Sequence, residues 1–360
     1  MSRLLNLAAV AAVLWISATG ARGAAAASQG ACSPAGGLGS ICGAVASEDL
    51  VRLPGTSWLI ASGLNVGRPA HLFLIDTQAK TAAPLFPVGQ PAMRMDPRFA
   101  PGCGGPPDLA RMSTDGLGLR PGPHGVHTLY AANHGDRKAI EVFEVDARGR
   151  RPQVRWEGCL PLPAGTLPNA VTPLSGGGLV VSSFYDPNDK TAWARMARGE
   201  ATGRLLEWRP GRGFRMMPGG AMSGANGLKT SADGRLIYAS AWSGRKLVIL
   251  DRQGGARREI ALDFMPDNIR RLGDGALLVG GQRTKVESIA ACTGPQCPQA
   301  WVVARVDPRT GTVRTLLSRE GTPEVNYACT ALEVDGVVYI TARGDGRILY
   351  APLSRLPSLN

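Results

Sequence analysis

The sequence predicts an all-β fold, a six-bladed β-propeller with a central calcium site at the mouth of its channel. Two observations predict the fold: 47 Gly and 27 Pro interrupt the 360 residues throughout, and one sequence unit recurs six times. Long windows of 3.6-residue apolar periodicity are missing, so many short strands joined by turns are expected. Oxygen-bearing side chains at the starts of the units predict the metal.

The first 27 residues have the pattern of a cleaved signal peptide. A short basic start is followed by an apolar run from Leu4 to Ile16 and then by small residues. The apolar run is too short to cross a bilayer, which takes about 20 residues. We therefore expect residues 28–360 to form a single exported propeller domain, periplasmic or secreted, with no transmembrane segment.

The repeated unit predicts the blades. Each unit opens with a polar residue and a short apolar strand, passes a Gly/Asp turn, and continues through a second and a third strand. The six units start at Asp49, His124, Asn169, Asn226, Asn268 and Thr330. Propeller sheets recur about every 40 to 50 residues, with insertions, whereas a β-sandwich would not repeat one motif six times. The longest insertion, residues 78–119, is rich in Pro, Gly and Met, and we expect it to form a lid or rim over the channel.

The polar residues that begin the units predict a metal site. The innermost strand of each blade runs along the propeller axis, so these residues converge on one end of the channel. Two carboxylates and three amides stand there: Glu48, Asn169, Asn226, Asp267 and Asn268. A single Asn or Asp at a strand end is commonly a turn residue. Five oxygen donors at equivalent points indicate calcium, because magnesium prefers more water and zinc prefers nitrogen or sulfur.

Seven cysteines in an exported chain predict disulfides. Cys292 and Cys297 bracket the turn-like segment TGPQ and are expected to pair. The odd count leaves at least one thiol free or bonded to another molecule. The remaining pairings stay open at this level.

The net charge of +12 does not predict a nucleic-acid partner. The basic residues are 34 Arg and 6 Lys spread along the whole chain, with one dense cluster between Arg148 and Arg155 that is typical of a solvated loop. Export also separates the protein from most nucleic acid.

From Ser47 to Pro352 the chain resembles the paraoxonase family of arylesterases and lactonases, which are related to the gluconolactonase-like propellers. The similar segments, in the family's order, are SEDLVRLPGTSWLIASGLN, PHGVHT, AANHGDRKAIEVFEVD, LPNAV, ANGLKTSADGRLIYAS and PDNI. The resemblance implies that the five oxygen donors are the ligands of a catalytic calcium ion. It also implies that His124 and His134 are the family's histidine pair, while His127 is expected to be structural.

The resemblance implies a second, structural calcium ion as well. Asp49 falls on one of its ligands, and the backbone carbonyl of Val126 falls on another. Ala170 stands where the family has an Asp, which predicts one calcium ion per chain instead of two. The cysteine of the family's closing strand is also missing near Ala351. Cys42 therefore has a different partner or none, and the first and last blades are fastened by another disulfide or by strand pairing alone.

The predicted function is calcium-dependent hydrolysis of small-molecule lactones or aryl esters. The metal would polarise the substrate carbonyl, and His124 would act as general base on a water molecule, with His134 either tuning the proton affinity of His124 or relaying the proton. The GxSxG motif of a serine esterase is missing from the sequence. One alternative is a non-catalytic extracytoplasmic propeller that binds a ligand or a protein partner. Another is a strictosidine-synthase-like condensing propeller, which would lack the calcium ligands.

Overall fold

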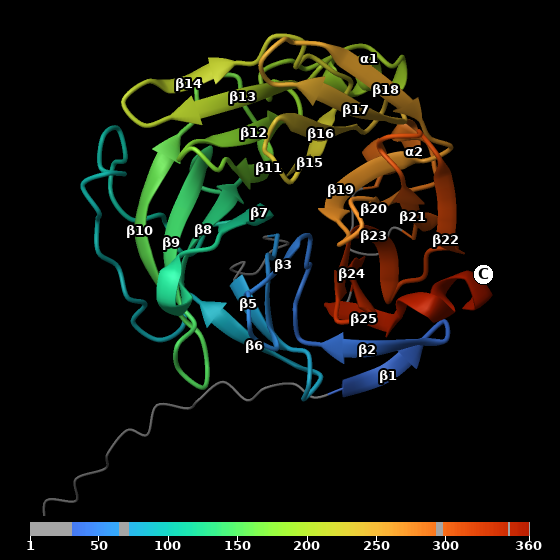
Figure 1. Ribbon diagram of the computed structural model, residues 1–360, viewed down its shortest axis with the longest axis horizontal. Helices are drawn as coiled ribbons and strands as arrows, with labels where there is room; N and C mark the ends of the chain where they lie inside the picture. The colour runs from blue at the N-terminus through green and yellow to red at the C-terminus, as the bar shows by residue number, and fades with distance from the viewer. Residues whose placement is uncertain (1–30, 65–71, 293–297, 345, 360) are drawn as a thin grey trace, which may run out of the picture.

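Six antiparallel sheets surround a central channel in the computed structural model (Figure 1), which describes residues 31–64, 72–292, 298–344 and 346–359. The predicted six-bladed β-propeller is confirmed. In each blade the strands run in chain order from the channel to the outside, except that the sixth blade receives its two outermost strands from the N-terminus. None of the described helices is long and apolar enough to cross a membrane.

The strands have the following bounds. The first blade comprises β3 (Leu50–Arg52), β4 (Trp58–Ala61), β5 (Leu72–Asp76) and β6 (Thr81–Phe86), and the second comprises β7 (Thr114–Arg120), β8 (Val126–Asn133), β9 (Ala139–Asp146) and β10 (Gln153–Pro161). The third comprises β11 (Pro168–Pro173), β12 (Leu179–Ser183), β13 (Arg204–Arg209) and β14 (Gly213–Met216), and the fourth β15 (Ala225–Thr230), β16 (Leu236–Ala241), β17 (Lys246–Asp251) and β18 (Arg257–Ala261). The fifth comprises β19 (Met265–Arg271), β20 (Leu277–Gln282), β21 (Trp301–Val306) and β22 (Val313–Arg319), and the sixth β23 (Val325–Val334), β24 (Val337–Gly344), β25 (Arg347–Pro352), β2 (Leu38–Cys42) and β1 (Ala31–Ala35).

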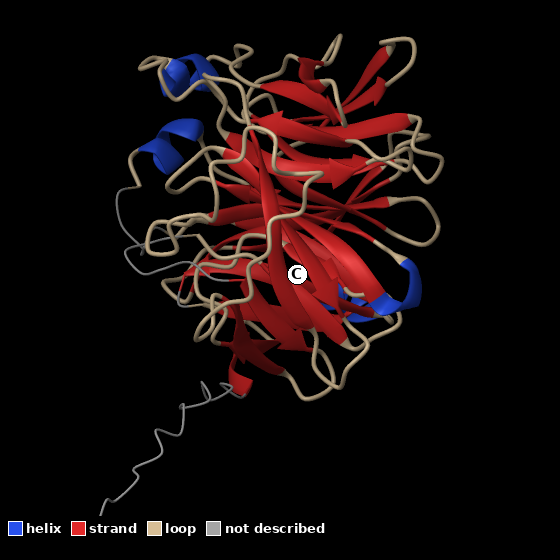
Figure 2. Cartoon of the chain, turned by 90° about the vertical axis from the view of Figure 1, so that its left-hand side faces the viewer, coloured by secondary structure: helices blue, strands red, loops and turns tan. Residues whose placement is uncertain are grey.

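Two short helices, α1 (Ala192–Ala197) and α2 (Val286–Ala290), lie on one face of the propeller, and two 3₁₀ segments, η1 (Pro123–Gly125) and η2 (Leu353–Leu359), complete the elements. Figure 2 shows α1 and α2 together on the same side of the sheets. Trp193 of α1 and Ile289 of α2 line the cavity at the mouth of the channel, so this face carries the mouth.

The strands in the middle of a blade are apolar on both faces because each blade is packed between two others. In β17 the alternation of side chains places Leu247 and Ile249 in the core shared with the fifth blade. Val248 and Leu250 point the other way, into the core shared with the third blade. The outermost strand has one exposed edge, and β18 accordingly reads RREIA, with a single buried residue. Because the outermost strands are mostly polar, the apolar pattern of the sequence predicts only three strands in each repeat, whereas the blades have four.

The second blade begins earlier than predicted. Its innermost strand is β7, which starts at Thr114, whereas the predicted start at His124 lies in the turn between β7 and β8. The prediction was wrong because PHGVHT matched a family motif better than the true strand start, STDGLGLR.

Part of the insertion after the first blade lies on the outside of the second blade. Residues 92–103 run along the outer strand β10, where the amide of Arg94 donates to the carbonyl of Trp156 at 2.9 Å. A disulfide joins Cys103 to Cys159 in β10. This stretch therefore covers an edge strand that would otherwise expose unpaired backbone groups. The end of the insertion returns to the mouth of the channel, where Ser113 lines the cavity.

The ring is closed by strand pairing. β2 pairs antiparallel with β25, so that Ile41 lies opposite Ile348. Cys42 pairs with Cys32 in β1, and this disulfide ties the two N-terminal strands to each other rather than to the last blade. Cys292 is disulfide-bonded, and its expected partner Cys297 lies outside the described residues.

Gly39→Ala should weaken this closure. A Cβ atom at Gly39 would lie 2.3 Å from the ring of Tyr350, its partner in β25. That ring is held between Lys80, 4.5 Å from its centroid, and Tyr339, so it cannot move aside freely. We expect a loss of about 1–3 kcal/mol in the free energy of unfolding, measured by denaturant titration. Gly176→Ala is the control, because a Cβ there meets nothing within 4 Å; equal stability of the two variants would contradict the prediction.

Candidate metal centre at the channel mouth

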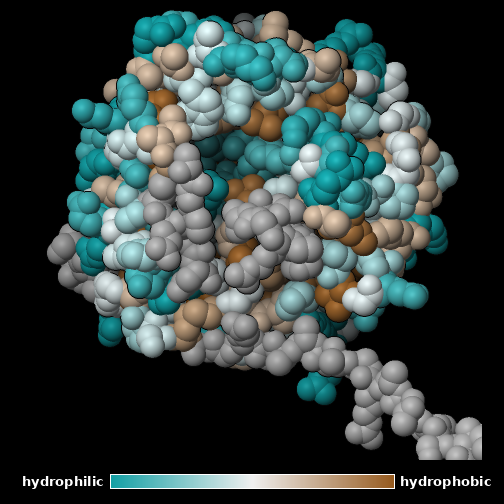
Figure 3. All heavy atoms as spheres, turned by 180° about the vertical axis from the view of Figure 1, so that it is seen from behind, coloured by the Kyte–Doolittle hydropathy of each residue, from teal (hydrophilic) through white to brown (hydrophobic). Residues whose placement is uncertain are grey.

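Each blade contributes one side chain to a ring at one end of the channel. The ring residues are Glu48, Asp115, Asn169, Asn226, Asp267 and Cys329, and all six line one cavity of about 370 Å³. Figure 3 shows the face that is hollowed by this cavity, with hydrophilic residues in its depth. The ring contains four of the predicted ligands and adds Asp115 and Cys329, which the sequence analysis did not select.

A shared backbone irregularity aims these side chains at the channel. In five inner strands the pairing register shifts at the ring residue, and regular pairing resumes two residues later, at Leu117, Val171, Leu228, Ile269 and Ala331. Such a bulge redirects a side chain that would otherwise point toward a neighbouring blade. The pattern Asp-Gly-Leu at Asp115 matches Asn-Gly-Leu at Asn226, and this signal could have identified Asp115 from the sequence.

The ring fits a divalent cation. Among the described residues, one buried side-chain oxygen has no hydrogen-bond partner in each of Glu48, Asp115, Asn169, Asn226, Asp267 and Asn268. Asn268 lies one residue beyond the ring, and its Nδ2 donates to Glu48 Oε1 at 2.7 Å. Buried oxygens without partners are costly, and a cation coordinated by several of them removes that cost. The structure thus brings the five predicted catalytic-calcium ligands together.

The electrostatics of the ring also favour a cation. Burial, together with repulsion from Asp115 and Asp267, raises the pKa of Glu48 well above its usual range. Burial also raises the pKa of Asp267 to about 7, against the opposing effect of a hydrogen bond from Gln282. Carboxylates in this position stay ionised most readily when a positive ion lies between them.

Gln282 links the ring to an aromatic wall at the mouth. Its Nε2 donates to Asp267 Oδ2 at 2.8 Å, which leaves Oδ1 as the unpartnered oxygen of that carboxylate. Its Oε1 accepts from the indole N–H of Trp242 at 2.7 Å. Trp242 packs edge to face against Phe184 and Trp193 of α1, with ring centroids 5.3 and 6.1 Å away. The apolar side of the cavity is therefore connected directly to a candidate ligand.

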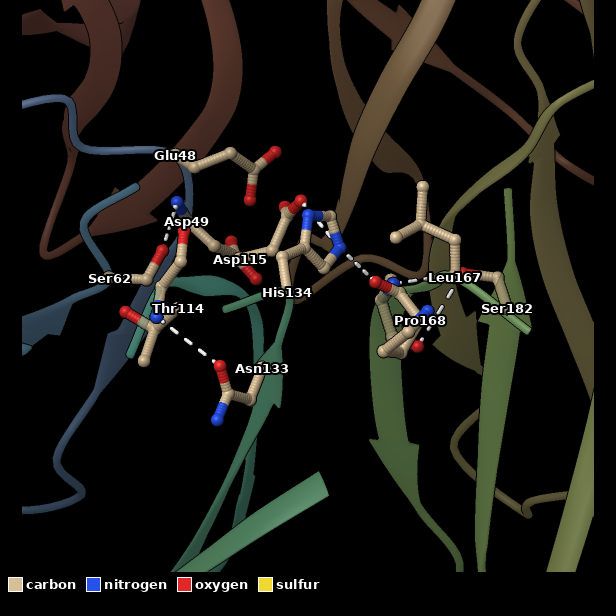
Figure 4. Close-up of polar contacts among 12 residues, drawn as sticks. Glu48, Asp49, Ser62, Thr114, Asp115, Asn133, His134, Leu167, Pro168 and Ser182 are labelled. Atoms are coloured by element: carbon tan, nitrogen blue, oxygen red, sulfur yellow. Dashed lines mark hydrogen bonds and ion pairs between the residues drawn. The ribbon is translucent and has the colours of Figure 1, made fainter. Parts of the chain in front are cut away.

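His134 reaches the ring from the end of β8. Its Nε2 lies 3.1 Å from Asp115 Oδ2 and also contacts the carbonyl of Pro168. Its backbone amide donates to Ser113 at 2.8 Å, which fixes it beside the start of β7. In Figure 4 the side chains of Glu48, Asp115 and His134 point toward one another. The structure thus brings His134 to the site, with a carboxylate as its neighbour.

His124 does not belong to this site. It is exposed in η1, beyond the far end of β7. Asp115 is the second residue of β7, and the five residues that follow it extend about 17 Å along the strand before the turn that holds His124. Asp115 occupies the place in the second blade that we had given to His124, so the histidine pair expected from the resemblance is an Asp–His pair here. Val126, expected as a backbone ligand, also lies at that far end, at the start of β8.

Asp49 is fully buried, and its hydrogen-bonding capacity is already used. Oδ1 accepts from the amide of Leu50 at 2.7 Å and from the hydroxyl of Thr330 at 2.9 Å. Oδ2 accepts from the amide of Leu117 at 2.7 Å. The guanidinium of Arg270, itself buried, forms an ion pair with Oδ1.

The second calcium ion does not fit this structure. Arg270 donates from Nε to the carbonyl of Leu50 at 3.0 Å and from Nη1 to the carbonyl of Ile269 at 2.8 Å, in addition to its ion pair with Asp49. A guanidinium thus neutralises the carboxylate that the resemblance assigned to the metal. The missing carboxylate at Ala170 agrees with this arrangement.

No family model and no curated protein matches this chain. Similar solved structures include a gluconolactonase from Xanthomonas campestris, with 17% identity, a TM-score of 0.54 and coverage of 91% of this chain and 98% of that one. A calcium-binding regucalcin from Agrobacterium tumefaciens has 11% identity, a TM-score of 0.52 and coverage of 86% and 90%. A luciferin-regenerating enzyme has 13% identity, a TM-score of 0.54 and coverage of 86% and 92%. At these identities the likeness is one of fold.

Replacing Arg270 tests whether it acts as a built-in cation. Arg270→Met keeps the volume but leaves the Asp49 carboxylate buried and unpaired, which should cost about 3–5 kcal/mol even at saturating calcium. Arg271→Met is the matched control, because Arg271 is exposed at the end of β19, and its effect should stay within about 0.5 kcal/mol. Thermal unfolding of the two variants measures the difference.

The wild-type chain should also hold one tightly bound calcium ion. Elemental analysis after dialysis against low calcium gives the ratio of calcium ions to protein chains. A ratio of two, or an Arg270→Met variant that melts like the wild type, would show that the guanidinium does not serve as the second cation.

Proposed function

We propose that this protein is a calcium-dependent hydrolase of lactones and related esters that acts outside the cytoplasm. The observation that carries the proposal is the ring of unpartnered buried oxygens with the His134–Asp115 pair beside it. Its likeness in fold to a gluconolactonase and to a calcium-binding regucalcin supports this reading. Two disulfides in the described part of the chain fit a periplasmic or secreted location.

The ring would hold one calcium ion through the oxygens of Glu48, Asn169, Asn226, Asp267 and Asn268. When bound, such an ion supplies positive charge that stabilises a carbonyl oxygen as negative charge develops on it. Gln282 fixes one oxygen of Asp267 and so keeps the other free to face the cavity. The aromatic wall of Phe184, Trp193 and Trp242 supplies an apolar surface for the remainder of the substrate and limits access of water.

His134 is the general base in this proposal. Because the Pro168 carbonyl accepts a hydrogen bond from Nε2, we assign the proton of the neutral ring to Nε2, and Nδ1 then carries the lone pair. Nδ1 takes a proton from water as the water oxygen attacks the carbonyl carbon. Asp115 stabilises the resulting imidazolium. The same proton then passes to the alkoxide oxygen released when the carbonyl carbon–oxygen single bond breaks, which gives the hydroxy acid or the acid and alcohol.

Replacing the histidines separates this mechanism from one that uses His124. His134→Gln should lower the rate of lactone hydrolysis by about 10²–10⁴-fold, because the proton acceptor is removed. His124→Gln is the control and should hydrolyse at the wild-type rate, since His124 is exposed at the other end of β7. The assay uses purified protein with a panel of lactones and aryl esters. A His134→Gln variant with full activity would remove this residue from the mechanism.

Removing calcium should affect hydrolysis and stability together. Without the ion the carboxylates of Glu48, Asp115 and Asp267, which come from three blades, repel one another, so chelation should lower both the rate and the melting temperature. Added calcium should restore both. If chelator lowers neither, the metal site is wrong. If the wild type binds calcium but hydrolyses no member of the panel, the non-catalytic binding propeller replaces the enzyme.

A further inference from the structure

The ring contains one sulfur atom, that of Cys329, and a thiolate binds zinc-class cations in a way that oxygen donors alone do not. We propose that Glu48, Asp267 and Cys329 form a site for a thiophilic divalent cation of the zinc class, which competes with calcium for the ring. The inference rests on the metal site proposed above and is independent of whether the protein hydrolyses esters.

The three groups are already close. The Cys329 sulfur and one carboxylate oxygen each from Glu48 and Asp267 all lie within 4.8 Å of one another, and all three residues are buried. Cys329 is the free cysteine in the described part of the chain, and its sulfur lies beside the Asp267 carboxylate. Little movement is needed for one ion to contact all three groups.

The backbone places this sulfur by the same device that places the other ring members. The pairing of β23 with β24 shifts between Ala328 and Ala331, at the point where the other inner strands carry their bulges. Cys329 therefore points into the channel instead of into a core between blades, and it lines the shared cavity. It occupies the sixth blade's place in the ring.

The donor set selects the class of ion. Calcium takes six to eight hard oxygen ligands and gains little from sulfur, whereas zinc binds thiolate and carboxylate in sites of four ligands. Three protein ligands with an open fourth position are the usual arrangement of a reactive zinc ion. Binding would release the thiol proton to solvent, and Arg343, which also lines the cavity, offsets part of the negative charge that results.

Cobalt reports directly on sulfur coordination. Full-length, metal-free protein is titrated with Co²⁺, and we expect a near-ultraviolet charge-transfer band from thiolate to cobalt that saturates at one equivalent and is displaced by Zn²⁺. Cys329→Ser should abolish the band and weaken Zn²⁺ binding by at least the roughly 10–100-fold that loss of a supporting group costs at metal sites. Calcium affinity, measured by calorimetric titration, should fall less than tenfold, because Cys329 is not among the five proposed calcium ligands.

His134→Gln is the matched control for this experiment, because His134 is not among the three proposed ligands. It should keep the cobalt band even where hydrolysis is lost. Absence of the band in the wild type, or its persistence in a folded Cys329→Ser variant, would overturn the inference. A protein that shows the band but hydrolyses no ester supports the inference and contradicts the proposed enzymatic function, so the two failures are distinguishable.

Discussion

The close approach of six inner strands around one axis is the constraint on which the rest of this molecule depends. A Cβ atom at Gly116 would lie 2.3 Å from the carbonyl oxygen of Asn169, and one at Gly227 would lie 2.2 Å from that of Asp267. Glycine at these positions lets the second blade reach the backbone of the third, and the fourth blade that of the fifth, at the level of the ring. The same proximity gathers carboxylates in a small buried volume, and positive charge must then balance them. Arg270 supplies that charge deeper in the channel, beside Asp49.

Much of the architecture could be predicted from the sequence, because its signals are local. Apolar strands that alternate with Gly and Asp turns identified the blades, and a polar residue ahead of each strand identified Glu48, Asn169, Asn226 and Asp267. Outer strands such as β18 were missed because solvent-facing residues remove the apolar pattern. The prediction that His124 begins the second blade was wrong because it depended on one short motif, PHGVHT, which begins in the turn after β7.

Other features could not be predicted, because they join positions far apart in the chain. The partner of Asp49, Arg270, comes from the fifth blade, and the local sequence around either residue does not predict their ion pair. Gln282 gains its importance only because the fold places it between Trp242 and Asp267. The odd number of cysteines does not say which one stays unpaired, and only the fold places the Cys329 sulfur in a ring of oxygen donors.

The way the ring closes has a consequence for how the protein is made. β2 and its partner β25 lie at opposite ends of the chain, so the propeller cannot be completed until nearly all of it has been synthesised. Until then β2 exposes an unpaired edge, which is prone to association with other chains. The Cys32–Cys42 bond closes a short loop between β1 and β2, and it can form without any other blade. In an oxidising environment the β1–β2 hairpin is therefore covalently closed before β25 is available to pair with it. In a reducing environment β1 and β2 are not covalently linked to each other during synthesis.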